Sequence, residues 1–232
     1  MKRLLLLLCL LSTPTWALTL TTEEYPPLNF SPDNGVTVSG SSTDLMREIM
    51  RRSGLTGTIS IYPWQRAFNM ALSIKDGCVF STTRTEAREQ QFKWVGPLST
   101  THWVLFAKAD SSIQAKTLED LRPYTIGGYQ GDAKALFLIE KGFKVDEAIN
   151  EDQNFKKLNA GRISLWAAGS DNGPWYAKKL NIKIKPVLDF NEVRLYAACN
   201  PAIPDADIAR MNEALKAIRA DGTYNRIFKA YE

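Results

Sequence analysis

The feature that most constrains this chain is an alternation of strand-like and helix-like segments, which two isolated β-like runs interrupt. The two runs are residues 103–108 and 193–199, and a second alternating series lies between them. Strand–helix alternation is typical of parallel sheets with helices on both faces. We therefore predict an α/β fold in which the two runs are long-range connections. The strands expected in the two series are residues 18–20, 58–62, 77–82, 124–126, 163–166 and 182–187.

The first residues have the three parts of a signal peptide. Lys2 and Arg3 form a basic region, residues 4–11 are apolar, and small residues lead to Ala17. The apolar run of about eight residues is far shorter than the ~20 residues that a membrane-spanning helix needs. We expect cleavage after Ala17 and a periplasmic location; an N-terminal anchor helix is the less favoured alternative.

Composition and charge exclude several classes of function. Hydrophobic residues make up 44% and charged residues 23% of the chain, which is ordinary for a globular protein. The net charge is +4, and Lys2 and Arg3 belong to the expected signal peptide, so the rest of the chain is close to balanced. That balance gives no basic surface for nucleic acid. The single histidine, His102, stands outside any cluster of metal-ligating residues, so we expect neither a metal nor a cofactor.

Two cysteines, Cys78 and Cys199, follow the expected signal peptide, and each lies in an apolar, strand-like stretch. A disulfide between them would close a loop of about 120 residues in a compartment that permits such bonds. The alternative is two buried free thiols that pack as small hydrophobic side chains. Because connectivity cannot be read from a sequence, we favour free thiols.

Four segments, in this order, carry a resemblance to a known family. They are the Tyr-Pro-Pro loop at residues 25–30, the segment 83–92, the glycine-containing segment 126–131 and the helical segment 215–231. Together they resemble the extracellular solute-binding proteins of the polar amino-acid type (bacterial solute-binding protein family 3). Members of that family are the periplasmic components of ABC importers.

The resemblance implies a type II periplasmic binding protein fold, in which two crossover strands join two α/β lobes. Lobe 1 would hold residues 18–100 and 195–232, and lobe 2 would hold residues 101–194. A ligand would bind in the cleft between the lobes, which close on it by a hinge. It also implies a monomer without catalytic activity, which captures a small polar solute and delivers it to an inner-membrane ABC permease.

Within this resemblance, Arg88 matches the arginine that binds a ligand carboxylate. A planar guanidinium with paired donors suits that group. Thr83 stands where the family places a hydroxyl that helps to bind the same carboxylate. The alternative is a surface arginine that forms a weak ion pair with Glu86 or Glu89. The neighbouring Arg84 either reaches the cleft or points to solvent.

Aromatic residues give further candidates for ligand contact. Tyr25 lies in the first ligand loop, and Trp64 begins a helix that we expect at the same rim, with Arg66 two residues later. Trp166 is a third aromatic candidate, in the expected second lobe. Aromatic faces suit flat or cationic ligands. The alternative for each of these aromatic residues is ordinary core packing.

In the second lobe the sequence departs from the family pattern. Ala133 stands where amino-acid binders carry a threonine, and Gly169 stands where they carry the acidic residue that holds the α-ammonium group. Asp132 and Asp171 are the two residues that could supply the missing charge. Asp132 has an equally good alternative, because a carboxylate at the start of a helix accepts hydrogen bonds from free backbone N–H groups.

Two other functions compete with solute capture. Some relatives are dehydratases that act on cyclohexadienyl acids such as prephenate, and that chemistry needs a positioned general acid. The available acids, Glu23, Glu24, Asp132 and Asp171, have no recognisable catalytic partner. The other alternative is a stand-alone periplasmic sensor. We favour a non-catalytic binding protein.

Overall fold

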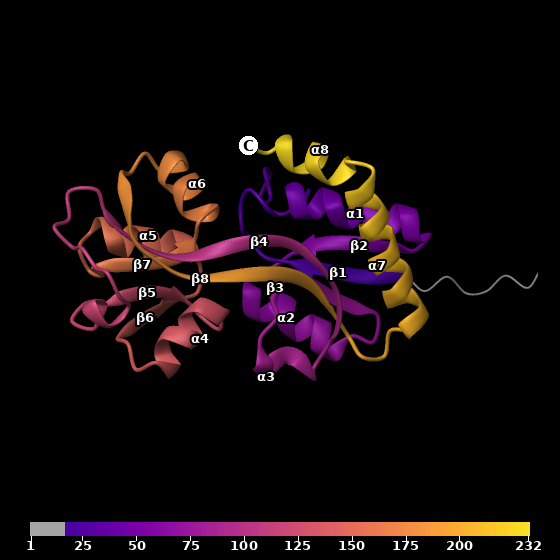
Figure 1. Cartoon of the computed structure of the whole chain (residues 1–232), viewed down its shortest axis with the longest axis horizontal. Coiled ribbons are helices and arrows are strands. Elements are labelled where there is room, and N and C mark those ends of the chain that lie inside the picture. Colours follow the sequence, from indigo (N-terminus) through magenta and orange to yellow (C-terminus); the bar gives the residue numbers. More distant parts are fainter. Residues whose placement is uncertain (1–16) are drawn as a thin grey trace, which may run out of the picture.

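A computed structural model describes residues 17–232, which form one eight-stranded mixed sheet in the order β2-β1-β3-β8-β4-β7-β5-β6 (Figure 1). The strands are β1 Ala17–Thr22, β2 Thr56–Ile61, β3 Gly77–Thr83, β4 Lys93–Lys108, β5 Ile126–Tyr129, β6 Val145–Ala148, β7 Leu165–Gly169 and β8 Ile184–Cys199. The helices are α1 Ser41–Ser53, α2 Trp64–Ser73, α3 Glu86–Glu89, α4 Ala133–Glu140, α5 Glu151–Asn159, α6 Asn172–Lys179, α7 Asp205–Ala220 and α8 Thr223–Lys229, with a 3₁₀ turn η1 at Glu119–Leu121.

Two long antiparallel strands, β4 and β8, join the two halves of the sheet. Each has 16 residues, and their pairing runs from Lys93 opposite Cys199 to Lys108 opposite Ile184. Figure 1 shows both strands passing from one group of helices to the other. The molecule therefore has two α/β lobes on a shared ribbon, as the type II periplasmic binding protein fold requires.

Lobe 1 is built around β1, which pairs in parallel with β2 and β3. Apolar side chains of α1 and α7, among them Ile49 and Leu215, pack with Leu20 and Phe80 on one face of this sheet. Trp64 and other residues of α2 pack on the opposite face. Helices therefore cover both faces of the parallel part of the sheet, as the strand–helix alternation predicts.

Lobe 2 has the same plan around β5, which pairs in parallel with β6 and β7. Phe155 and Trp166 lie in one of its apolar clusters, whereas Ile126 and Leu138 lie in another. The boundaries expected between the lobes, after residues 100 and 194, fall inside β4 and β8. They stay a prediction, because both strands continue without a break through these positions.

Most expected strands are present, with three differences. Residues 182–187 and 193–199 belong to the single strand β8 rather than to two strands. Residues 103–108 are only the second half of β4, whose first half includes Pro97 where the register with β8 shifts. A proline cannot donate a hydrogen bond to a neighbouring strand, so a segment that contains one is not readily predicted as a strand. The sequence analysis missed β6, because its four residues include Asp146 and Glu147 and lack an apolar pattern.

The expectation of two free thiols is wrong. Cys78 and Cys199 form a disulfide between residues that are 121 positions apart in the chain. They stand directly opposite each other in the antiparallel pair of β3 and β8, and both are fully buried. The pairing of these two strands brings the sulfur atoms together, which the sequence alone does not reveal.

The expected signal peptide lies almost wholly outside the described residues, which begin at Ala17 in the first position of β1. Its cleavage after Ala17 stays a prediction. Within residues 17–232, no helix has the length and apolar character needed to span a bilayer.

Replacing both Cys78 and Cys199 by alanine should lower the free energy of unfolding by roughly 4 kcal/mol, because the crosslink restricts a loop of about 120 residues in the unfolded chain. Denaturant unfolding of the oxidised protein and the double variant measures this difference. Reducing agent should destabilise the wild-type protein alone. Two free thiols found by mass spectrometry of the purified protein would contradict the disulfide.

Candidate functional site

The candidate site lies where loops after the parallel strands of both lobes meet. Open α/β sheets bind ligands beyond the carboxyl ends of their strands. Residues after β1, β3 and β5, together with residues of the crossover strands, enclose a cavity of only about 10 Å³ between the lobes. Its lining residues are Glu23, Tyr25, Trp64, Ser81, Thr83, Arg88, Thr101, Trp103, Asp132, Lys134 and Leu195. Of the eight expected site residues, five line it: Tyr25, Trp64, Thr83, Arg88 and Asp132.

Arg88 is buried, with 7% of its surface exposed, although it belongs to the short helix α3. Its guanidinium donates hydrogen bonds of 3.2 Å to the carbonyl oxygens of Thr83 in lobe 1 and Gly131 in lobe 2. No carboxylate of residues 17–232 lies within ion-pair distance of it. Burial lowers the pKa of Arg88, against the opposite effect of nearby carboxyls, but an arginine stays charged in proteins.

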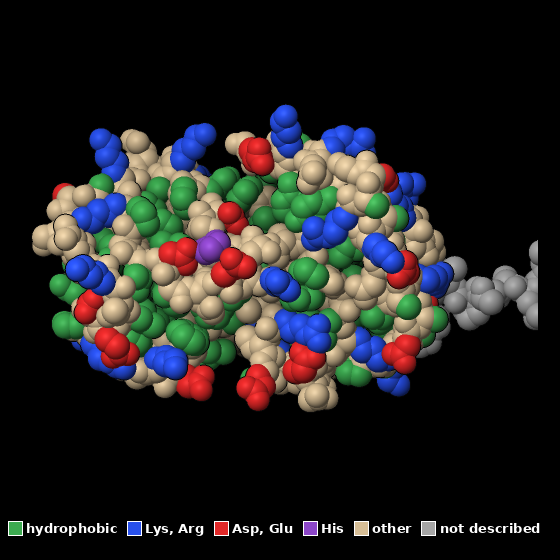
Figure 2. Space-filling model, viewed as in Figure 1, with side chains coloured by type: hydrophobic (Ala, Val, Ile, Leu, Met, Phe, Trp, Pro, Cys, Tyr) green, Lys and Arg blue, Asp and Glu red, His purple; other side chains and the backbone are tan. Residues whose placement is uncertain are grey.

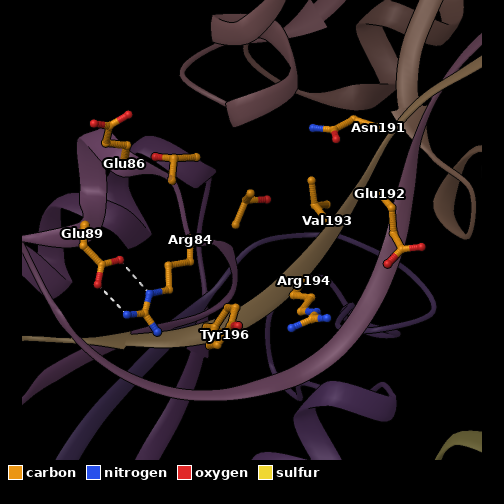
Figure 3. Close-up of a pocket in the computed structure, with 10 residues that line it drawn as sticks. Arg84, Glu86, Glu89, Asn191, Glu192, Val193, Arg194 and Tyr196 are labelled. Carbon is orange, nitrogen blue, oxygen red and sulfur yellow. Dashed lines mark hydrogen bonds and ion pairs between the residues drawn. The ribbon is translucent and has the colours of Figure 1, made fainter.

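The surface ion pair expected as the alternative for Arg88 is made by Arg84 instead. Arg84 is exposed and binds both carboxylate oxygens of Glu89 (Figure 3). Arg88 instead contacts α2, with its guanidinium carbon 5.2 and 5.0 Å from the ring centres of Trp64 and Phe68. Aromatic faces and backbone carbonyls therefore replace an anion around this buried cation.

Asp132 and Lys134 form an ion pair at the start of α4, in which the lysine is buried and the aspartate is partly buried. The Asp132 carboxylate accepts a hydrogen bond of 2.7 Å from the backbone N–H of Lys134 and lies 2.9 Å from its ammonium nitrogen. Burial by itself lowers the pKa of Lys134, but Asp132, Tyr25 and Glu151 together raise it by more, so the side chain stays charged. Asp132 is thus both the helix cap that we considered and the partner of a lysine that the sequence analysis did not select.

Glu23, directly after β1, is the other residue that the analysis of ligand contacts missed. Only 3% of its surface is exposed, and its Oε2 atom has no hydrogen-bond partner among residues 17–232. Burial raises the pKa of the Glu23 carboxyl well above its ordinary value, and Asp132 raises it further. No local pattern marks Glu23, because its burial depends on side chains that are far away in the sequence.

A buried amide holds the loop that carries Glu23. The Asn29 side chain donates to the Glu23 carbonyl oxygen at 2.5 Å and accepts from the Ser81 hydroxyl at 2.5 Å. Ser81 has a φ of +58° at the point where the register between β3 and β8 shifts. Such a conformation is unfavourable for a non-glycine residue and is found preferentially at functional sites.

Trp64 contributes hydrogen bonds between the lobes rather than an exposed ring. Its backbone N–H donates to the Tyr129 hydroxyl at 3.0 Å, and its indole N–H donates to the Gly131 carbonyl oxygen at 2.9 Å. The Gly131 carbonyl therefore accepts from both Trp64 and Arg88 of lobe 1. These bonds hold the lobes in the closed arrangement.

Comparisons with known proteins agree with this architecture. The model of the bacterial extracellular solute-binding proteins, family 3, matches residues 18–232. The chain belongs to this family. The histidine-binding periplasmic protein of Escherichia coli K12 is 26% identical over 91% of this chain and 85% of its own length.

Solved structures show the same fold. A histidine kinase sensor domain with similarity to periplasmic binding proteins superposes with a TM-score of 0.86 at 21% identity, covering 93% of this chain and 95% of that one. An ancestral arginine-binding protein bound to arginine has a TM-score of 0.80 at 24% identity, covering 93% and 97%. The fold is therefore shared by binding proteins and by a sensor domain.

The two departures from the solute-binding family pattern have structural counterparts. Ala133 packs in an apolar cluster between the lobes with Tyr25 and Trp103. The Tyr25 hydroxyl lies against Gly169, so closely that a β-carbon on Gly169 would overlap it. A tyrosine hydroxyl from lobe 1 therefore occupies the space where the pattern has an acidic side chain of lobe 2.

Three other expected site residues lie outside the cavity lining. Trp166 is fully buried in the core of lobe 2 and donates to the Glu151 carboxylate at 2.8 Å, so its interpretation as a cleft residue does not fit its position. Arg66 is exposed and stacks over the Tyr62 ring at 4.3 Å. Asp171 is half-buried; burial raises its pKa, and hydrogen bonding to Thr101 opposes this effect.

Larger cavities lie beside the small one. A groove of about 580 Å³ runs along β8 and is lined by Arg84, Glu89 and Tyr196 among others (Figure 3). Its arginine and glutamate already pair with each other at the surface. A second cavity, of about 530 Å³, is lined by residues of both lobes, including Tyr62 and Glu151. Burial raises the pKa of Glu151 to about 7.

On the face shown in Figure 2, the single histidine lies among acidic side chains between the two lobes. His102 Nδ1 of β4 is 2.7 Å from the Asp189 carboxylate of β8, and Nε2 is 3.8 Å from that of Glu192. Within the part of the chain that the structure describes, no group of three or more His, Cys, Asp or Glu residues is arranged to hold a metal ion.

Replacing Gly169 by alanine should hold the lobes apart, because the new β-carbon overlaps the Tyr25 hydroxyl only when they are closed. Overpacking of this kind costs about 1–3 kcal/mol. Small-angle scattering should show a larger radius of gyration than for the wild-type protein. Adding Tyr25→Phe, which removes the hydroxyl, should restore part of the closed population. An unchanged radius of gyration for Gly169→Ala would contradict this contact.

Proposed function

We propose that this protein captures a small polar solute with a carboxylate group in the periplasm and delivers it to an inner-membrane ABC permease. Arg88 is the observation that carries the proposal: a buried cation in the interlobe cleft whose hydrogen bonds go to backbone carbonyls and not to an anion. A buried charge without a countercharge is costly, so the site favours a ligand that brings one.

A carboxylate suits Arg88 by shape as well as by charge. Two parallel N–H donors bind both oxygens of a carboxylate and fix its orientation. Thr83, at the end of β3, accepts a hydrogen bond from Arg88 through its carbonyl oxygen and lines the same cavity, which supports a role for its hydroxyl in this contact. Tyr25 and Trp64 supply aromatic walls in the same cavity. These four residues are our proposed ligand contacts from lobe 1.

Solute entry requires that the lobes separate. A cavity of about 10 Å³ has room for one water molecule at most, whereas small-molecule sites enclose hundreds of Å³. The bonds to be broken are few: those from Trp64 to Tyr129 and Gly131, and that from Arg88 to Gly131. Bending of β4 and β8 would then act as the hinge, as in other two-lobed binding proteins.

The relatives support amino acids as the first solutes to test. The E. coli relative is named for histidine, and the structural neighbours include proteins bound to arginine or glutamine. We also infer that residues 1–17 are a signal peptide cleaved after Ala17, and that the mature protein acts as a monomer. The basic and apolar residues that begin the chain support export.

An enzyme on the same fold is the second candidate, and one observation favours it. Glu23 is a buried carboxyl with a raised pKa, which is a property of general acids. Incubation with prephenate, followed by the absorbance of phenylpyruvate, separates the two functions. We expect no turnover; turnover that Glu23→Gln abolishes would make the protein a dehydratase.

A ligand that binds the folded protein should raise its melting temperature by roughly 5–10 °C at a hundredfold excess over Kd. We expect carboxylate-bearing compounds to do so in a screen of amino acids, dicarboxylates, polyamines and small peptides. Arg88→Ala should abolish the shift while circular dichroism shows an intact fold.

Arg84→Ala is the matched control, because Arg84 is four residues away, is exposed and pairs with Glu89. It should leave the shift unchanged. If carboxylates stabilise Arg88→Ala as well as they stabilise the wild-type protein, the role of Arg88 is refuted. If only polyamines stabilise the wild-type protein, the proposed solute class is wrong.

A further inference from the structure

Four acidic or basic side chains line the cleft cavity, and only two of them satisfy each other. Asp132 and Lys134 form an ion pair of 2.9 Å. Arg88 donates to carbonyl oxygens alone, and Glu23 has a carboxyl oxygen without any hydrogen-bond partner among residues 17–232. Glu23 and Arg88 line the same cavity. The site therefore offers one unpaired positive group and one unpaired acidic group to a ligand.

The backbone of Glu23 is held in position by a hydrogen-bond network within lobe 1. Its carbonyl accepts from Asn29, and Asn29 accepts from Ser81, whose left-handed backbone conformation keeps its side chain in the cavity lining. Asn29 is fully buried, so this arrangement is fixed by the interior of lobe 1. A buried polar atom left without a partner destabilises the folded protein, and a hydrogen-bond donor of the ligand would remove this cost.

The other acidic residues near the cleft are not free for a ligand cation. Gly169 has no side chain, and the Tyr25 hydroxyl fills the space beside it. Asp132 is paired with Lys134. Asp171 does not line the cavity.

We propose that Glu23 binds the ammonium group of the captured solute while Arg88 binds its carboxylate. The inference rests on the proposed function and narrows the solute to a zwitterion with both groups. In the family pattern the acidic residue that binds the ammonium group belongs to lobe 2, at the position of Gly169. In this protein we assign that role to Glu23, in the first loop of lobe 1.

Binding should then release a proton. The groups that face Glu23 are Asp132 and Lys134 of α4, Glu151 of α5 and Arg88 of α3; burial and the two acids raise the pKa of Glu23, and the two cations lower it. The free carboxyl therefore keeps its proton to a higher pH than an ordinary glutamate does. An ammonium group binds the ionised form, so affinity should rise with pH as Glu23 loses its proton and weaken at lower pH.

The test compares amino acids with matched compounds that lack the α-amino group. The pairs are L-glutamine with glutaramate, L-glutamate with glutarate, L-histidine with imidazole propionate, and L-arginine with guanidinovalerate. Titration calorimetry should show that the wild-type protein prefers the amino acid of the pair it binds. Glu23→Gln should weaken binding of that amino acid at least about thirtyfold, as expected for a buried charge pair, and leave the matched compound within about twofold.

Glu24→Gln is the control, because Glu24 is adjacent in sequence but accepts a hydrogen bond from Ser31 and does not line the small cavity. It should bind like the wild-type protein. Calorimetry in two buffers of different ionisation enthalpy, repeated over a series of pH values, gives a second measure that needs no variant, namely proton release on binding in the pH range where the affinity rises.

Tight binding of an amino acid by Glu23→Gln, or binding to the wild-type protein without proton release at any pH of the series, would overturn the role of Glu23 and leave that of Arg88 intact. Equal affinity of the wild-type protein for an amino acid and its matched compound would likewise overturn the role of Glu23. If none of these carboxylates binds, the proposed function fails together with this inference.

Discussion

The pairing of β4 with β8 is the constraint on which the rest of the structure depends. Because both strands run through both lobes, their register fixes which residues meet across the cleft. Few polar contacts hold the cleft closed. Trp64 and Arg88 both donate to the carbonyl oxygen of Gly131. The Tyr25 hydroxyl lies against Gly169. Two continuous strands that can bend, together with a small number of breakable contacts between the lobes, are the arrangement that a hinged binding protein needs.

The sequence predicted the fold well where the information is local or carried by the family motifs. The alternation of strands and helices and the two isolated β-like runs gave the lobes and the crossovers. The Cys78–Cys199 disulfide was not predictable, because residues 121 positions apart become partners only through the register of β3 and β8. The first half of β4 was not predicted either, because Pro97 lies where the hydrogen-bond register with β8 shifts.

For the candidate site, the sequence predicted Arg88, which belongs to a family motif. It did not predict the residues whose role depends on their burial in the folded protein. Arg88 stands in the family segment and lies in the cleft lining. Glu23 and Lys134 are ordinary surface residue types, and their burial depends on side chains that are far away in the sequence. Trp166 shows the opposite case: it lies in a strand covered on both faces, so its ring is enclosed in the core of lobe 2.

The most direct test of the account is a crystal structure of the protein with the solute that raises its melting temperature most. We predict that the solute lies between the lobes, with its carboxylate bonded to the Arg88 guanidinium in place of the carbonyl of Gly131. A solute bound instead in the groove beside Arg84 and Tyr196, with Arg88 still bonded to Gly131, would contradict the account.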